Sequence, residues 1–585
     1  MSLGRTGEST SQAWHWLALA FIVASFCAAV IRLHPTNFFG YTEDDSIYFS
    51  SAKALAEGKG YVLASFPGMP SATKYPVFYP WLLSWVWRWN HSFPSNLTGA
   101  IALTLAFGAL YVTVSFLFLR RFKKLSQVEA LTLTAFCALH PHVLFYSGNV
   151  LSEIPFAALA LGAMLLAERA MQPLAPPVPV ICCGILTGLC ILTRTFGVPV
   201  AVGIIVAGIV YRAWKQSLIF GASIIPSLAV LCGEMISSRT IAPPVSGVAA
   251  SSLGWVHTWA YYSSYPNVWR IGVPTKAIFL AMLKNNSVAL LSAPAAYFLS
   301  PLVRGETMAG TVAIVLTTAA ILAGIFRDAR DNGFRPVHFI LPFYGSLIVL
   351  WNYPNANRFL IPLLPLLGAG LWLESKRLLE MASAATGVGK HLTEKLIAGG
   401  FSILLAAFAL ALLVNYFGKA RSLFPEVSRK RAALLLEKRE AYDWLARLPD
   451  ARARVVAYED GSLYLYTGHQ ASRAFTFTTA EFYDPPRLDS DLEHFTDVAR
   501  AINAAYWVSS ADDYGYEWPA AYAKGQARMT DLERVLAVAF RSQQNRVTIY
   551  SLDCALSKDA TACRSALGLL SPAFHKLQAV EQHPR

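Results

Sequence analysis

Three consecutive carboxylates, Glu43-Asp44-Asp45, are the most reactive cluster in this sequence. They stand at the start of a predicted helix over residues 45–57, which the Gly-Lys-Gly run at 58–60 ends. Repulsion between adjacent carboxylates raises the pKa of at least one of them and favours a proton-accepting or cation-binding role. An acidic residue before a helix also accepts backbone N–H bonds and complements the helix dipole. The residues alone leave both interpretations open.

A second set of candidates consists of charged residues at the ends of apolar segments, away from the main basic clusters. Lys74, Arg194 and Arg358 are such cations. Arg binds phosphate oxygens through paired hydrogen bonds, and Lys acts as a point charge. The alternative is that they snorkel towards lipid headgroups. We favour phosphate binding for Lys74 and Arg358. Arg194 stays open, as does Glu153, which is either a helix-dipole partner or a second acidic site residue.

The elements that must position these residues are membrane helices. Of 585 residues, 55% are hydrophobic and 15% are charged, and the mean hydropathy is +0.41. Soluble domains carry about 25% charged residues. The net charge of +13 is gathered in short clusters beside apolar segments. This is the positive-inside pattern of membrane proteins, so we do not expect a nucleic-acid partner.

The hydropathy pattern predicts a polytopic α-helical membrane protein with about eleven crossings. The predicted spans are 14–33, 98–119, 127–146, 152–169, 178–194, 196–214, 217–236, 308–326, 337–351, 359–374 and 396–414. The segment 286–303 is predicted to be re-entrant or interfacial, because a full crossing there would place Arg327, Arg330 and Arg335 outside. The N-terminus is then inside and the C-terminus outside.

Two domains follow from this pattern. Residues 1–415 form the membrane domain, with a long outer loop at 34–97 that carries the acidic cluster. Residues 416–585 form an extracytoplasmic α/β domain. Its predicted elements are a charged helix at 425–448 and strands at 454–458, 463–466, 505–509 and 547–552.

Cysteine and histidine give two smaller expectations. Cys554 and Cys563 lie together in the polar C-terminal part, and we predict a disulfide between them in an oxidising compartment. His140 and His142 flank a proline at a helix end. A metal site there is the less favoured interpretation, because histidines at a membrane interface are commoner.

The order of motifs resembles that of the GT-C glycosyltransferases. An acidic pair is followed by Tyr48, by Gly58-Lys59-Gly60-Tyr61 and by Lys74-Tyr75-Pro76. Further landmarks are Ser-Glu-Ile-Pro-Phe at 152–156, Leu-Thr-Arg-Thr-Phe-Gly at 192–197 and Asn-Arg-Phe-Leu-Ile-Pro at 357–362. The sequence is similar to the protein O-mannosyltransferase, lipid A aminoarabinose transferase and lipopolysaccharide-core transferase types of that superfamily.

The resemblance implies roles for single residues. The register set by Tyr48 puts the catalytic carboxylate at Asp44, and Asp45 falls where relatives often have Glu. The candidate substrate-binding residues are Lys74, Tyr75, Glu153, Arg194 and Arg358. No cofactor is required by the resemblance. A divalent metal stays open, because related transferases differ in needing one and Thr73 stands where some carry a metal-binding acid.

The function implied by the resemblance is transfer of a sugar from a polyprenyl-phosphate carrier to an envelope glycolipid, polysaccharide or protein, with inversion. The expected location is the bacterial inner (plasma) membrane, with the active site on its extracytoplasmic face. The rival interpretation is a transporter or lipid flippase. Such proteins usually show inverted repeats and ionisable residues near the membrane midplane. The predicted spans here are nearly free of charge, which favours an enzyme.

Overall fold

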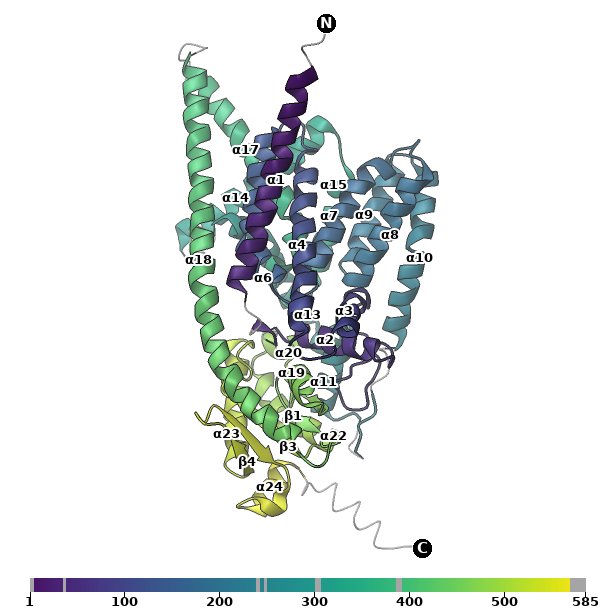
Figure 1. The fold of residues 1–585 in the computed structure, drawn as a ribbon, viewed down its shortest axis with the longest axis vertical. Helices are drawn as coiled ribbons and strands as arrows, with labels where there is room; N and C mark the ends of the chain where they lie inside the picture. The colour runs from purple at the N-terminus through teal and green to yellow at the C-terminus, as the bar shows by residue number, and fades with distance from the viewer. Residues whose placement is uncertain are drawn as a thin grey trace. The chain divides into compact units, whose positions relative to one another are not determined.

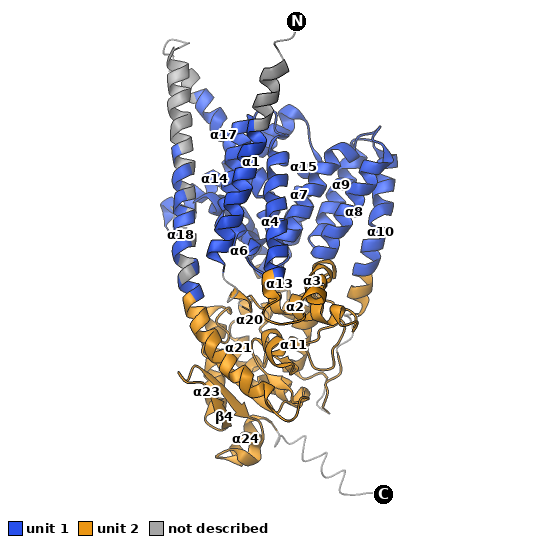
Figure 2. Cartoon of the chain, in the orientation of Figure 1, with its two compact units in different colours: residues 1–35, 99–231, 282–428 blue, residues 36–98, 232–281, 429–585 orange. Residues whose placement is uncertain are grey.

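The computed structural model describes residues 5–34, 38–40, 42–237, 242–246, 250–299, 307–385 and 392–568. Its contacts divide the chain into two compact units, which Figure 2 colours blue and orange. Unit 1 comprises 1–35, 99–231 and 282–428, and unit 2 comprises 36–98, 232–281 and 429–585. The predicted boundary near residue 415 cuts the chain at a single point, whereas each unit collects three separate segments. The predicted boundary stays a prediction.

Unit 1 is built from helices (Figure 1). Its elements are α1 (Arg5–Leu33), α4 (Leu97–Leu119), α5 (Gln127–Leu139), α6 (Pro141–Ser147), α7 (Glu153–Ala170), α8 (Pro177–Thr193), α9 (Gly197–Val210), α10 (Trp214–Ser237), α13 (Lys276–Leu299), α14 (Met308–Asn332), α15 (Pro336–Val349), α16 (Ala356–Phe359), the 3₁₀ turn η2 (Ile361–Leu363), α17 (Leu364–Ala385) and α18 (Leu392–Ala446). Helices α4, α10, α13 and α18 also have residues in unit 2.

The chain is an integral membrane protein. In the described part of it, α1, α4, α10, α13 and α14 are long and apolar enough to cross a membrane. The pair α5 and α6, bent by 58° at Pro141, adds a sixth crossing if it is one broken span. Helices α8, α9 and α15 are apolar but shorter. The count of eleven crossings stays a prediction.

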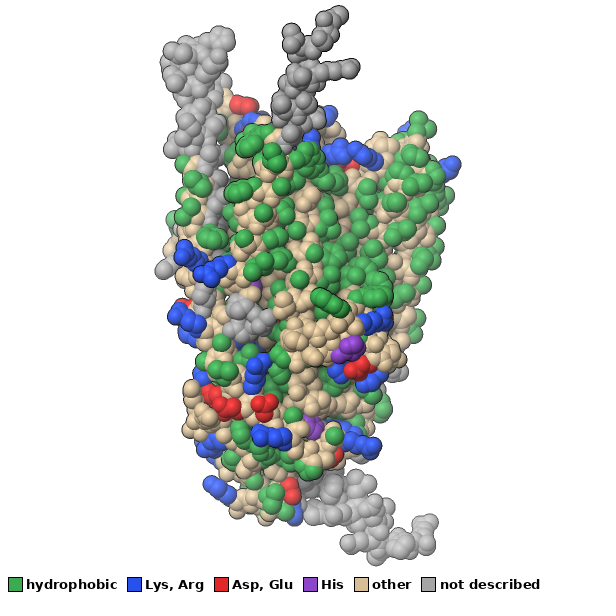
Figure 3. Space-filling view, in the orientation of Figure 1, with side chains coloured by type: hydrophobic (Ala, Val, Ile, Leu, Met, Phe, Trp, Pro, Cys, Tyr) green, Lys and Arg blue, Asp and Glu red, His purple; other side chains and the backbone are tan. Residues whose placement is uncertain are grey.

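Hydrophobic side chains cover the outside of these helices. Phe21 on α1 and Leu218 on α10 are 73% and 75% exposed. In Figure 3, green hydrophobic side chains cover most of the visible face of unit 1. An exterior of this kind suits hydrocarbon rather than water as the surrounding medium.

Helices inside unit 1 approach closely where small residues face each other. A Cβ on Gly184 or Gly188 of α8 would lie about 2.5 Å from Ser223 or Ser227 of α10. A Cβ on Gly324 of α14 would meet the backbone of α17. Small residues one turn apart let apolar helices pack at short range in a membrane.

The basic clusters of the sequence meet at one end of unit 1. Lys124, after α4, pairs with Asp331 of α14 at 2.8 Å. Arg335 pairs with Asp328 of α14 at 2.9 Å and lies 3.6 Å from Glu168 of α7. This grouping is what the charge rule predicts for loops on one side of a membrane.

The segment predicted to be re-entrant forms part of a continuous helix. Residues 276–299 are helical throughout as α13, and residues 300–303 lie outside the described residues. Asn286 Nδ2 donates to the Val349 carbonyl oxygen at 3.0 Å, which fixes α13 against the end of α15. The re-entrant or interfacial course stays a prediction.

Unit 2 combines short helices with one sheet. Its elements outside the shared helices are α2 (Asp44–Ala56), α3 (Phe78–Trp89), α11 (Leu253–Ser263), α12 (Tyr265–Gly272), β1 (Val455–Val456), α19 (Asp460–Thr467), β2 (Ala471–Ser472), α20 (Thr479–Tyr483), α21 (Arg487–Asp491), η3 (Leu492–His494), α22 (Asp497–Ala501), β3 (Tyr506–Ser510), α23 (Pro519–Glu533), β4 (Ala537–Arg541), β5 (Val547–Ser551), η4 (Cys554–Leu556) and α24 (Ala560–Ala566).

The sheet has the strand order β2-β1-β3-β5-β4. Strands β2, β1 and β3 are parallel, and β5 pairs antiparallel with β3 and β4. Val508 lies opposite Ile549, and both contribute to a buried core with Leu445 and Tyr442 of α18. The predicted strands at 454–458, 505–509 and 547–552 correspond to β1, β3 and β5.

One predicted strand is wrong. Residues 463–466 lie in helix α19. Their alternating Leu-Tyr-Leu-Tyr sequence has the period of a strand, but Gly468, at φ +80°, ends the segment as a helix C-cap. Buried Leu463 joins the core from this helix. The short strand β2 and strand β4 were not predicted.

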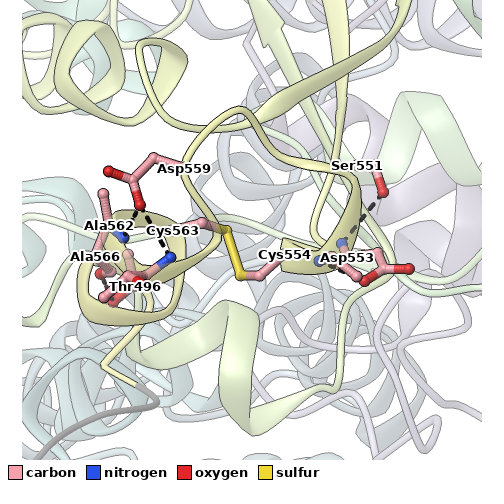
Figure 4. The surroundings of a disulfide bond; sticks show 10 residues. Thr496, Ser551, Asp553, Cys554, Asp559, Ala562, Cys563 and Ala566 are labelled. Carbon is pink, nitrogen blue, oxygen red and sulfur yellow. Dashed lines mark hydrogen bonds between the residues drawn. A yellow bond between two sulfur atoms is a disulfide. The ribbon is translucent and has the colours of Figure 1, made fainter.

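The predicted disulfide is present. Cys554 in η4 and Cys563 in α24 are bonded across a sequence separation of nine (Figure 4). Asp559 caps α24 by accepting from the backbone N–H groups of Thr561 and Ala562 at 3.0 and 2.8 Å. Thr496 Oγ1 donates to the Ala566 carbonyl oxygen at 3.3 Å, which ties α24 to the rest of unit 2.

Candidate functional site

The acidic cluster lies at the N-terminus of α2, as the sequence predicts. Asp44 and Asp45 are its first two residues, and Glu43 precedes them. The backbone of Glu43 has φ +61°, in the left-handed region. A non-glycine residue there costs about 1–3 kcal/mol and is found mainly at functional sites. Gly58 and Gly60 follow the helix at φ +74° and +82°, which glycine adopts without strain.

Asp45 holds the start of the helix. Its side chain is fully buried, and its two carboxylate oxygens accept from the backbone N–H groups of Gly40 at 2.8 Å and Ser46 at 2.7 Å. Burial raises the pKa of Asp45 to about 7, against the effect of these hydrogen bonds, and the neighbouring Asp44 charge adds to the rise. The capping interpretation of the acidic cluster therefore describes Asp45.

Asp44 faces side chains of the same loop, between α1 and α4. It is 9% exposed, and its Oδ1 accepts a hydrogen bond from the hydroxyl of Tyr75. Tyr75 is held in turn by Tyr61, whose hydroxyl donates to the Tyr75 carbonyl oxygen at 2.7 Å. The ring of Tyr75 packs on that of Tyr48, 4.6 Å between centroids. Asp44 is thus oriented by a tyrosine that is itself fixed.

Lys74 and Tyr261 extend the cluster to α11. The Lys74 ammonium nitrogen lies 3.2 Å from the centroid of the Tyr261 ring, a short cation–π contact. The Tyr261 hydroxyl donates to Glu43 Oε2 at 2.9 Å, and Arg473 donates to the same oxygen. Tyr261 thus contacts both Lys74 and Glu43, and Glu43 in turn contacts Arg473, all within unit 2.

A cavity of about 310 Å³ opens beside Glu43. Its walls carry carboxylates, tyrosine rings and one guanidinium group, which can hydrogen-bond to or stack on a polyhydroxylated molecule. The lining residues are Gly40, Thr42, Glu43, Tyr261, Tyr458, Glu459, Arg473, Asp512, Gly515, Tyr516 and Glu517. All of them belong to unit 2.

A second cluster lies in unit 1. Arg194 follows the last residue of α8 and pairs with Glu153 Oε1 at 2.8 Å. Arg358 of α16 donates from Nε to the same oxygen of Glu153, the first residue of α7. Arg194 Nη1 also donates to Ser152 Oγ at 3.0 Å. Two guanidinium groups share one carboxylate, so the cluster keeps a net positive charge that suits an anion.

The structure thus divides the predicted site residues between the units. Unit 2 brings together Asp44, Asp45, Lys74 and Tyr75, and unit 1 brings together Glu153, Arg194 and Arg358.

Three residues of unit 2 were missed as site residues. Glu43 is part of the acidic run, and its position beside Asp44 was a usable signal. Tyr261 lies in an aromatic-rich segment, and that composition does not single out one residue as part of the site. Arg473 lies far away in sequence, and no local pattern marks it.

Of the two histidines His140 and His142, His140 caps helix α6 and His142 lies within it. The His140 side chain accepts from the backbone N–H of His142 at 3.3 Å at the start of α6, and its Nε2 lies 3.3 Å from the Tyr297 carbonyl oxygen. These contacts engage both ring nitrogens of His140.

Protein groups engage most of the oxygens in the acidic cluster. The two oxygens of Asp45 accept backbone hydrogen bonds, and Glu43 Oε2 is engaged by Arg473 and Tyr261, while Glu43 Oε1 is buried without a hydrogen bond to the described residues. Thr73, at the position of a metal-binding acid in some relatives, donates to the Ser263 carbonyl oxygen. We therefore derive no step through a metal at this site.

Comparison with known proteins gives matches in structure only. No family model and no curated protein matches this sequence. The archaeal oligosaccharyltransferase AglB from Archaeoglobus fulgidus, in complex with an inhibitory peptide and a dolichol-phosphate, is 14% identical with a TM-score of 0.51. The match covers 92% of this chain and 74% of that one. The same oligosaccharyltransferase with zinc and sulfate is 13% identical with a TM-score of 0.51 over 91% and 73% of the two chains.

The chain has the GT-C fold. This confirms the fold that the order of motifs along the membrane part predicts. ArnT from Cupriavidus metallidurans, bound to undecaprenyl phosphate, also matches, at 15% identity and a TM-score of 0.47 over 92% of this chain and 98% of that one. In this chain, the acidic cluster occupies the first long loop between apolar helices, α1 and α4.

Proposed function

We propose that this protein is a membrane glycosyltransferase that takes its sugar from a polyprenyl-phosphate carrier. The observation that carries the proposal is the buried Asp44 carboxylate in a chain with the GT-C fold. Tyr75 orients this carboxylate, and the preceding residue, Glu43, lines a polar cavity. The AglB structure contains a dolichol-phosphate, which supports a lipid phosphate as the donor's carrier.

In the proposed reaction, Asp44 is the general base. An acceptor hydroxyl attacks the anomeric carbon, its proton passes to the Asp44 carboxylate, and the bond between that carbon and the phosphate oxygen breaks. The products are a new glycosidic bond with inverted configuration and a free polyprenyl phosphate. The phosphate monoester is a good leaving group, so the main electrostatic task is to stabilise its growing negative charge.

Lys74, Arg194 and Arg358 are the proposed cations for that task. Arg194 and Arg358 share Glu153, so the pair retains positive charge for a phosphate. Lys74 stands next to Tyr75, the residue that orients Asp44. Glu153 positions the two arginines in this account.

We assign the acceptor to the cavity beside Glu43. Its tyrosines and carboxylates suit the hydroxyl groups of an envelope glycolipid, polysaccharide or protein. We further propose that the active site and the C-terminal residues lie outside the bacterial inner membrane. The Cys554–Cys563 disulfide supports this side, because such bonds persist in oxidising compartments.

Transfer of a labelled sugar tests the proposal against the transporter or flippase alternative. The full-length protein in detergent is mixed with a polyprenyl-phosphate sugar, labelled in the sugar, and an extract of envelope glycolipids. We expect label in a new covalent product together with release of polyprenyl phosphate. Label that stays on the donor lipid under all acceptor conditions would contradict a transferase.

A further inference from the structure

A buried group of three metal-ligand side chains lies apart from the acidic cluster, within unit 2. His257 is on α11, Glu481 on α20 and Asp491 on α21. Their exposed fractions are 1%, 0% and 5%. One ligand atom from each of the three side chains lies within 4.8 Å of the other two. Three helices thus bring one imidazole and two carboxylates to one point.

Two buried polar atoms at this point are ion-pair partners of each other but form no hydrogen bond with a described residue. His257 Nδ1 and Glu481 Oε1 are buried and form no hydrogen bond with any part of the chain that the structure describes. They lie 3.2 Å apart, at the distance of an ion pair but without hydrogen-bond geometry. A buried polar atom left without a hydrogen bond costs about 1–3 kcal/mol, so such atoms usually mark a missing partner.

The opposite sides of the carboxylates are held by the protein. Glu481 Oε2 closes a capping box by accepting from the Thr478 backbone N–H at 2.8 Å and from its hydroxyl. Asp491 Oδ2 accepts from Arg487 Nε at 2.9 Å. These contacts fix the carboxylates and direct Glu481 Oε1 towards His257. Outer contacts of this kind orient ligands in metal sites.

We propose that His257, Glu481 and Asp491 bind a divalent transition-metal ion, and that zinc fits the donor set best. One imidazole nitrogen and two carboxylate oxygens are a common zinc set, and the two carboxylates balance the charge of the ion. Around a tetrahedral zinc with bonds of about 2.0–2.2 Å, neighbouring ligand atoms lie about 3.3–3.5 Å apart. The distance of 3.2 Å between His257 and Glu481 is close to this value.

The role of the ion is structural. Helix α11 also carries Tyr261, whose hydroxyl donates to Glu43. At the other end of α11, Gly254 N–H donates to Asp497 Oδ2 at 3.1 Å. A metal on His257 would therefore fix the middle of α11 to α20 and α21 and keep Tyr261 in place. The inference holds whether or not the protein is a transferase.

Metal analysis of the full-length protein tests the site. The protein is purified in detergent with an affinity tag free of histidine, stripped with a chelator, reloaded with zinc and freed of excess ion. We expect about one zinc ion per chain by elemental mass spectrometry. His257→Ala and Glu481→Gln should lower the zinc affinity by at least about tenfold. His142→Ala, which changes a half-buried histidine in unit 1, is the control and should bind like wild type.

Cobalt supplies a readout that does not depend on the variants folding. Wild-type protein loaded with Co²⁺ should show the intense visible bands of a tetrahedral cobalt site with nitrogen and oxygen ligands. Two outcomes would overturn the proposal. One is wild-type protein that retains less than about a tenth of an equivalent of zinc and shows no cobalt bands. The other is folded His257→Ala protein that binds zinc as tightly as wild type, which would leave His257 and Glu481 as a buried ion pair only.

Discussion

Asp44 and Asp45 are neighbours in sequence but lie in different environments. Both oxygens of Asp45 accept backbone N–H bonds, so its carboxylate serves the start of α2. Asp44 accepts from the Tyr75 hydroxyl, within the loop that also carries Lys74. The arrangement supports the register in which Asp44 is the base and Asp45 is a support.

Tyr75→Phe tests the orientation of Asp44. The substitution removes one hydroxyl and keeps the ring that packs on Tyr48. One lost hydrogen bond to a charged group, worth about 1.5–3 kcal/mol, should lower turnover by roughly tenfold to a hundredfold. Thermal stability should change little, and Tyr146→Phe in unit 1 is the control. Turnover equal to wild type would mean that Tyr75 does not orient the base.

Arg358→Ala tests the cation cluster of unit 1. The change removes one of two guanidinium groups that share Glu153, so the cluster loses its surplus positive charge. We expect weaker binding of the donor, by about tenfold or more in KM for the lipid-phosphate sugar. Arg212→Ala, at the basic loop before α10, is the control. If Arg358→Ala uses the donor as wild type does, the cluster only joins the helices.

The sequence predicted the site residues that lie close together in one loop better than those that lie far apart along the chain. The acidic cluster, Lys74 and Tyr75 fall within one loop, and their spacing marks them. Arg473 was missed because it reaches Glu43 across 430 positions of the chain. Pairing at such a range depends on how unit 2 folds, which local pattern does not encode.

At the scale of elements, the disulfide closes the loop between η4 and α24. The chain-entropy model gives up to about 3 kcal/mol for a loop of this length. Replacing Cys554 and Cys563 together by Ser should therefore lower thermal stability and leave the active-site loop unchanged. Thiol labelling of the denatured, unreduced wild type should find both cysteines blocked. Reactive thiols at both positions would contradict the bond.

The turn after β3 predicts a pH dependence of stability. Burial raises the pKa of Asp513 to about 8, while nearby Lys438 opposes the rise. The unfolded chain loses this proton near pH 4, so between about pH 4 and pH 8 unfolding releases a proton. Stability should therefore fall as pH rises through that window.

The matched variant is Asp513→Asn, which cannot titrate. Its melting temperature should fall less than that of wild type between about pH 5 and pH 8. The melting temperature of Asp513→Asn should still fall to some extent, because burial also raises the pKa of Asp45 and of Asp460 to about 7. An equal fall in the two proteins would show that Asp513 is ionised throughout.

Hydropathy and turn signals predicted most elements well. The spans at 98–119 and 217–236 match α4 and α10 within a few residues, and 45–57 matches α2. The error at 463–466 arose because four residues fit a strand period and a helical turn equally. A tertiary contact decides between them, since Leu463 packs in the core from α19.

At the scale of the whole molecule, unit 2 gathers three distant parts of the sequence. The loop 36–98, the segment 232–281 and residues 429–585 share one compact unit. Sequence composition separates polar from apolar segments but does not show which polar segments fold together. The contacts of Glu43 with Tyr261 and Arg473 show this for all three parts.

The central claim is that Asp44 removes a proton from the acceptor while a sugar leaves a lipid phosphate. Asp44→Asn keeps the shape of the side chain and an acceptor oxygen for the Tyr75 hydroxyl, but it removes the proton acceptor. Expression and thermal stability should stay near wild type. Asp45→Asn, which leaves the proposed base in place, is the comparison for register.

The deciding measurement is the rate at which polyprenyl phosphate is released from a polyprenyl-phosphate sugar in the presence of the envelope acceptor extract. The account predicts release by wild type and a rate for Asp44→Asn that is lower by at least about a hundredfold, since general-base catalysis contributes about 10²–10⁴. Asp45→Asn should be affected less. Release by Asp44→Asn at the wild-type rate would contradict the account.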